Sequence, residues 1–182
     1  MKNIEFYANP KGEVVITENE QLRVYKESDI DFTGKMLSII KERYSQAYEA
    51  LCDTYKESRP NRTYFEFQVV RRFIKCNFFQ YDNILDIDEH GTLHFEYVPC
   101  PVRGECKLCG VICNPKYTTP LTEREKEVMG MYYRGVTPEQ ICSELNITLL
   151  TFQTHKRNAY MKMRVSTLSE FHNFATNNRL FV

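Results

Sequence analysis

The feature that most constrains this chain is a pair of short helices, each with its own start signal, within residues 121–163. Thr122 stands where a helix N-cap is expected, and Glu125 follows three residues later, so the two residues form a capping-box pattern. Gly135 is the kind of residue that ends such a helix. Pro138 then opens a second helix at the position where proline is best tolerated. Two helices this short must pack against each other and against further helices to bury their apolar faces.

A third helix is predicted directly after a turn of three residues, Asn146–Thr148. It runs over Leu149–Met163, and a fourth helix is predicted over Thr167–Asn177. Two helices joined by a turn of this length form the helix-turn-helix motif, whose second helix lies in the DNA major groove. The sequence therefore predicts a partner, double-stranded DNA.

The predicted recognition helix carries polar side chains that can read DNA. With Phe152, Ala159 and Met163 facing the core, the polar residues left towards solvent are Thr151, Gln153, Thr154, Lys156 and Arg157. Glutamine pairs with adenine edges, arginine or lysine pairs with guanine, and threonine contacts a thymine methyl group or a phosphate. Lys162, at the far end of the helix, is better placed for the phosphate backbone. No acidic residue lies between Glu144 and Glu170, so this stretch forms a basic stripe.

The segments LTEREKEV, GVTPEQIC and TFQTHKRNAYMKM resemble the LuxR-type helix-turn-helix family in order and distance, over about a third of the chain. The resemblance implies a bacterial transcription regulator, with Gln153, Thr154, Lys156 and Arg157 on the DNA-reading helix. His155 matches the family's histidine, and a packing role and a phosphate contact are equally consistent with this position. The resemblance also implies a homodimer through residues 167–178. The N-terminal part matches neither the phosphoacceptor nor the acyl-lactone sensor domains common in this family.

A second candidate site is the cysteine-rich segment CPVRGECKLCGVICNP. Its four thiols, Cys100, Cys106, Cys109 and Cys113, suit a thiophilic metal. The pattern favours structural zinc, but an iron–sulfur cluster and unmetallated thiols remain open. His90 and His94 lie close upstream and are candidates to replace one thiolate.

The N-terminal part is predicted to be a small α+β domain. Asn3–Tyr7 and Val14–Thr17 are expected to form a hairpin, Phe32–Tyr55 one amphipathic helix, Arg62–Phe79 a further helix and Leu93–Val98 a closing strand. Asp82, Asp86, Asp88 and Glu89 are interpreted as an acidic loop, because they lack the spacing of a calcium loop.

The whole chain is thus expected to hold an α+β domain (residues 1–98), a cysteine-rich linker (99–117) and an all-α, four-helix, LuxR-type helix-turn-helix domain (118–182). The absence of a signal peptide or membrane-length apolar run predicts a cytoplasmic protein that has no membrane partner, with reduced or metal-bound cysteines. The sequence contains neither a set of residues for nucleophilic catalysis nor a Gly-rich phosphate loop, so the protein is not expected to be an enzyme. Two alternatives remain, a regulator that senses redox state or metal through its cysteines and a protein-interaction module.

Overall fold

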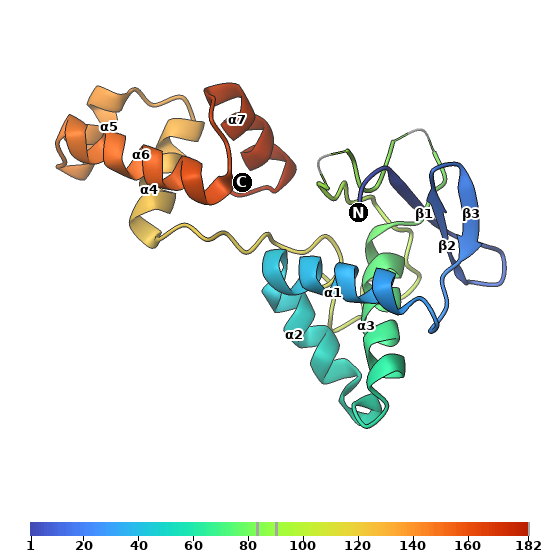
Figure 1. The fold of residues 1–182 in the computed structure, drawn as a ribbon. Helices are drawn as coiled ribbons and strands as arrows, with labels where there is room; N and C mark the ends of the chain where they lie inside the picture. Colours follow the sequence, from blue (N-terminus) through green and yellow to red (C-terminus); the bar gives the residue numbers. More distant parts are fainter. Residues whose placement is uncertain (83, 90, 182) are drawn as a thin grey trace. The chain divides into compact units, whose positions relative to one another are not determined.

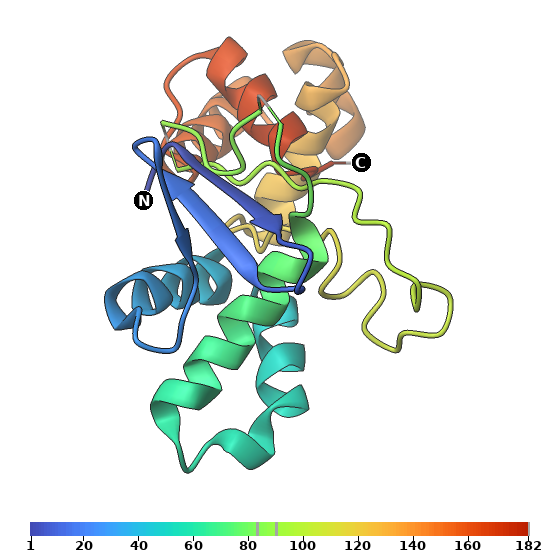
Figure 2. The ribbon, with the colours of Figure 1, turned by 90° about the vertical axis from the view of Figure 1, so that its right-hand side faces the viewer.

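The computed structural model describes residues 1–82, 84–89 and 91–181, and it divides into two compact units, Met1–Thr118 and Thr119–Val182 (Figures 1 and 2). The elements of the first unit are β1 (Ile4–Ala8), β2 (Val14–Glu18), β3 (Gln21–Val24), α1 (Ile30–Arg43), α2 (Ser45–Thr54), the short 3-10 helix η1 (Lys56–Ser58) and α3 (Arg62–Asn77). No helix of the described residues is long and apolar enough to cross a membrane.

The three strands form an antiparallel sheet in the order β1-β2-β3. The predicted hairpin is confirmed, and its turn is built by Asn9, whose Oδ1 accepts hydrogen bonds from the amides of Lys11 (3.0 Å) and Glu13 (2.9 Å). Strand β3 was not predicted from the sequence. Its four residues are too few to show a clear alternation, and Leu22 is 59% exposed although it is apolar.

The single helix predicted over residues 32–55 is wrong, because the structure has two helices that meet at Tyr44. The backbone of Tyr44 leaves the helical region (φ −140°, ψ 54°). Thr118 binds the backbone on both sides of this break. Its amide donates to the Arg43 carbonyl (2.6 Å), and its hydroxyl oxygen accepts from the Ser45 amide (2.9 Å). The buried Tyr44 ring packs on Phe73 of α3. A tertiary contact thus replaces the helical hydrogen bonds at this point.

Helix α3 is the centre of the first unit. The predicted helix over residues 62–79 is confirmed in all but its last residues, and Asn61 caps its start by accepting from the Tyr64 amide (3.2 Å). Its buried face packs against α1, α2 and the sheet (Figure 1). Phe73 on this face and Phe6 of β1 are fully buried. These contacts make one core for the whole unit.

The closing strand predicted over residues 93–98 is also wrong. Ile87 forms isolated bridges with Ile4 and Leu93, but residues 94–98 form no strand. Instead, the Glu96 amide donates to the Asn77 carbonyl at the end of α3 (2.9 Å). This backbone therefore pairs with a carbonyl that lacks a partner within the helix, and not with a neighbouring strand. The cysteine-rich segment follows and belongs to the same unit, since Ile112 lies fully buried in its core.

The second unit consists of α4 (Glu123–Tyr133), α5 (Pro138–Leu145), α6 (Leu149–Met163) and α7 (Leu168–Asn177) (Figure 1). All four lie where the sequence predicts them, and both reciprocal hydrogen bonds of the Thr122–Glu125 capping box are present. Two small clusters fill the unit. Met129, Ala159 and Phe171 join α4, α6 and α7, while Val128, Ile141 and Phe152 join α4, α5 and α6.

Candidate nucleic-acid interface

The turn between α5 and α6 sets the direction of the third helix in this unit. Asn146 ends α5 in the left-handed region (φ 52°, ψ 49°), which asparagine tolerates better than most residues. The amide of Ile147 then donates to the Cys142 carbonyl (3.0 Å). Arg124 of α4 reaches the same turn, where its Nη2 donates to the Leu145 carbonyl (2.7 Å). Hydrogen bonds from the backbone and from Arg124 therefore hold the turn from which α6 starts.

One face of α6 is buried and the other is open. Phe152, Ala159 and Met163 are buried, as the sequence predicts. The exposed side chains on the opposite side recur at the matching helical spacing, and they are Leu150, Gln153, Thr154, Arg157 and Met161, while Leu149 and Lys162 are exposed beside this face. Of the predicted base-reading residues, the structure thus leaves Gln153, Thr154 and Arg157 open to a partner.

The electrostatics of α6 favour an anionic partner. The helix contains no aspartate or glutamate, and it carries Lys156, Arg157 and Lys162. Thr148 caps its N-terminus by accepting from the Thr151 amide (3.2 Å), and the free amides of the first turn add a partial positive charge there. A polyanion that approached this helix along its length would meet only neutral or basic side chains of α6.

Two of the predicted DNA contacts, Lys156 and Lys162, have partners inside the unit. The Nζ of Lys156 donates to the Tyr132 hydroxyl (3.1 Å) and lies 4.8 Å from the centre of that ring and 5.3 Å from the Tyr160 ring. The Nζ of Lys162 donates to Oε2 of Glu125 (2.6 Å), whose side chain is only 5% exposed. Both ammonium groups therefore stabilise the contact between α6 and α4.

Of the remaining predicted residues on α6, Thr151 and His155 lie at the edges of the open face, while Thr154 lies on it. Thr151 is half-buried, and its hydroxyl is 2.9 Å from that of Thr148. The Thr154 hydroxyl donates to the Leu150 carbonyl (2.9 Å). His155 is half-buried beside the open face. Sequence reasoning did not single out Leu150, which is 73% exposed, although it stands one helical turn before Gln153 and Thr154 and so shares their face.

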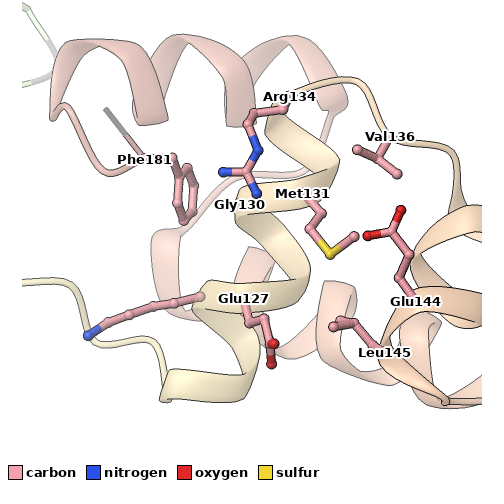
Figure 3. Close-up of a pocket in the computed structure, with 9 residues that line it drawn as sticks. Glu127, Gly130, Met131, Arg134, Val136, Glu144, Leu145 and Phe181 are labelled. Atoms are coloured by element: carbon pink, nitrogen blue, oxygen red, sulfur yellow. The ribbon is translucent and has the colours of Figure 1, made fainter.

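A pocket of about 490 Å³ lies elsewhere in this unit (Figure 3). Its lining residues come from α4, α5, the loop between them and the segment after α7, and none belongs to α6. The Phe181 ring covers Gly130, where an added Cβ would stand 3.3 Å from Cδ1 of that ring. The pocket is therefore separate from the open face of α6.

The cysteine-rich segment holds the other predicted site. Cys100, Cys106 and Cys113 are half-buried, while Cys109 is exposed. Within the described ranges, no three histidine, cysteine or acidic side chains are placed to hold a metal ion together. Nε2 of His94 lies 3.1 Å from Oδ2 of Asp88, and His90 lies outside the described residues.

Comparison with known proteins assigns a family to the second unit. Residues 119–175 match the model for bacterial regulatory proteins of the LuxR family. The chain is similar to the HTH-type transcriptional regulator MalT of Vibrio campbellii (43% identity over 53 residues, 29% of this chain and 6% of that protein). It is also similar to MalT of Klebsiella pneumoniae (47% over 49 residues, 27% of this chain and 5% of that protein). No solved structure matches the chain significantly.

Residues 119–175 thus form a LuxR-family helix-turn-helix domain, which confirms the resemblance seen in the sequence. The chain spans only about a twentieth of the length of these relatives, and the matched stretch lies within its second unit. The first unit, Met1–Thr118, has no counterpart in this match.

Proposed function

We propose that this chain is a DNA-binding transcription regulator and that α6 reads the major groove. The observation that carries the proposal is the open, acid-free face of α6, which follows a fixed turn within a LuxR-family domain. Both relatives named above are HTH-type transcriptional regulators by their names.

Three side chains of this face have distinct proposed roles. Arg157 is exposed, and it can pair with the O6 and N7 acceptors of a guanine or with a phosphate. Gln153 can pair with N6 and N7 of an adenine, and Leu150 offers an apolar surface to a thymine methyl group. Lys156 and Lys162 act mainly by holding α6 on α4, because their ammonium groups already have partners there.

The proposal is tested by selecting binding sites from a randomised duplex library with the full chain and then measuring affinity by anisotropy across a salt series. Arg157→Ala is expected to weaken binding by about 1–3 kcal/mol, which is roughly a 5- to 150-fold rise in Kd. Lys35→Ala is the matched control, because it removes an exposed cation from α1 of the first unit. It is expected to leave the Kd unchanged.

Two outcomes would contradict the proposal. If the full chain binds no duplex even at low salt, where phosphate contacts are strongest, the second unit is better described as a protein-interaction module. If Arg157→Ala and Lys35→Ala weaken binding equally, the open face of α6 is not the reading surface. Gln153→Ala adds a separate readout, since it is expected to relax sequence preference at one base pair rather than to weaken binding to every sequence.

A homodimer through residues 167–178 is also proposed, on the family resemblance. Within this range Leu168 is 47% exposed at the start of α7, which leaves an apolar side chain for a second copy. Analytical ultracentrifugation of the full chain and of Leu168→Glu measures the state directly. A dimer that Leu168→Glu dissociates supports the proposal, and a monomer at all accessible concentrations contradicts it.

A further inference from the structure

The outer face of the three-stranded sheet carries a row of side chains that point away from the core. Successive residues of a strand point to opposite faces, so Glu5 and Thr17 turn away from the face on which Phe6 and Ile16 are buried. Glu5 of β1 stands opposite Thr17 of β2, and Thr17 stands opposite Leu22 of β3. One row across all three strands thus presents a carboxyl group, a hydroxyl group and an apolar side chain.

A pocket of about 440 Å³ lies against this row. Three exposed hydrophobic side chains line it, Leu22 of β3 and Tyr81 and Leu85 from the segment after α3. The polar lining residues are Asn3, Glu5, Thr17, Asn19 and Glu20. The described lining therefore holds two carboxyl groups and no lysine or arginine. A pocket of this size, with a few polar groups among apolar ones, suits a small organic molecule.

Glu5 gives this pocket a polar group that lacks a partner. The residue is only 4% exposed, and Oε1 of its carboxyl group accepts from the Asp82 amide (2.9 Å). Oε2 is buried, and none of the described residues supplies a hydrogen-bond partner for it. The Thr17 hydroxyl, in the same row, is likewise buried without a partner in the described part of the chain. Because the large majority of buried polar side-chain atoms are hydrogen-bonded, two neighbouring exceptions beside a pocket indicate a ligand that supplies donors.

The charges around Glu5 favour a cationic ligand. Burial raises the pKa of the Glu5 carboxyl group, and the charges of Asp82 and Glu96 raise it further, so the site lacks positive charge. Protonation would not satisfy Oε2, because its new O–H group would itself be buried without an acceptor. An ammonium group has three N–H donors, which can serve the Glu5 carboxylate and the Thr17 hydroxyl oxygen together.

We propose that this pocket binds a small organic amine whose ammonium group is held by Glu5 and Thr17. The apolar body of the amine lies against Leu22, Tyr81 and Leu85. Entry requires a small movement of the side chains around Oε2, and Tyr81 and Leu85 can supply it because they are exposed in a segment without helix or strand. The site is independent of the proposed DNA-binding function, since every lining residue belongs to the first unit.

The test uses phenethylamine as the probe and follows its binding to the full chain by two-dimensional NMR of the backbone amides. We expect the probe to shift the amide signals of Glu5, Thr17 and Leu22. Glu5→Gln keeps an acceptor for the Asp82 amide and removes the charge, so the Kd is expected to rise roughly 10- to 150-fold. Phenethyl alcohol, the neutral analogue, is expected to bind more weakly by a similar factor. Glu13→Gln is the matched control, because it removes an exposed carboxylate that does not line the pocket, and it should leave the Kd unchanged.

Leu22→Lys keeps the test decisive even if Glu5→Gln does not fold. The Leu22 side chain is exposed, so the change leaves the core intact and brings a competing ammonium group to the pocket. It is expected to abolish binding of the probe. The proposal is overturned if phenethylamine does not bind, if phenethyl alcohol binds equally well, or if the shifted signals lie away from the pocket. It is also overturned if Glu5→Gln and Glu13→Gln weaken binding equally, or if Leu22→Lys leaves the Kd unchanged.

Discussion

The ion pair between Lys162 and Glu125 gives the sharpest test of how the second unit is held together. Oε2 of Glu125 accepts from the Lys162 ammonium (2.6 Å) and from the Thr122 amide (2.8 Å), and the Glu125 side chain is 5% exposed. Replacing Lys162 by methionine keeps the apolar stem and removes the charge. The buried carboxylate then loses its cation but keeps its capping-box bond.

The size of the effect follows from these contacts. A hydrogen bond to a charged group contributes about 1.5–3 kcal/mol. The Lys162 side chain is 36% exposed, so water replaces part of what is lost, and we expect a value near the lower end, about 1.5 kcal/mol. For a unit of this size, that corresponds to a fall in Tm of roughly 6–12 °C.

The pH dependence has a defined sign. Burial alone would raise the pKa of Glu125, but the bonds from Lys162 and Thr122 outweigh it and hold the pKa below its usual range. A group whose pKa is depressed in the folded state contributes stability above its unfolded value, about 4.3, and loses it as the pH falls through the folded value. The difference between the variant and the parent is therefore expected to shrink in acid.

Hydrogen exchange measured by mass spectrometry is the suitable assay, because peptides from α4 and α6 report this unit within the full chain. Lys126→Met is the matched control, since Lys126 pairs with Glu123 (2.7 Å), whose side chain is 90% exposed. We expect little change there. Equal protection loss in both variants, or none in Lys162→Met, would refute the reasoning. If Lys162→Met instead lowers only the salt dependence of DNA binding, by about 1 in slope, Lys162 is a phosphate contact.

Three further predictions concern other parts of the chain. Burial raises the pKa of Asp86 to about 9, so the folded state holds a proton that the unfolded state releases near pH 3.9, and stability is expected to fall as the pH rises between these values. Asp86→Asn should flatten this dependence of Tm on pH. Thr137→Ala removes the side-chain cap of α5 and is expected to cost about 0.5–2 kcal/mol in chemical unfolding, unlike Thr137→Ser. Asn146→Ala places an alanine in the left-handed region and should destabilise the second unit by about 1 kcal/mol, whereas Asn146→Gly should be nearly neutral.

The helices of the second unit could be predicted from the sequence because each carries its own start signal. Thr122, Thr137, Thr148 and Thr167 all cap helices by accepting from a backbone amide three residues later. The break at Tyr44 could not be predicted in this way. Its determinant is Thr118, which lies 73 residues beyond Ser45 in the chain, and the local apolar pattern continues through the break.

In the candidate sites too, local features could be predicted from the sequence and contacts between distant residues could not. The buried face of α6 follows from the spacing of Phe152, Ala159 and Met163, so its open face could be predicted as well. The partner of Lys162 could not, because Glu125 lies 37 residues away on another helix. Likewise, nothing in the spacing of the cysteine-rich segment points to Asn77 of α3, whose side chain bonds to the backbone of Ile112 and Asn114 on either side of Cys113.

The contact of Arg124 with the Leu145 carbonyl bears on how this motif can be moved between proteins. A carbonyl at the end of α5 is satisfied by a side chain of α4, so the angle between α5 and α6 depends on a helix outside the two-helix motif. A chimera that transplanted only residues 137–163 would carry the side chains that face DNA but would lose Arg124. The Leu145 carbonyl would then depend on the host protein for a hydrogen-bond donor. The smallest portable module is therefore α4 together with α5 and α6, and specificity swaps are better made by exchanging single side chains on the open face of α6.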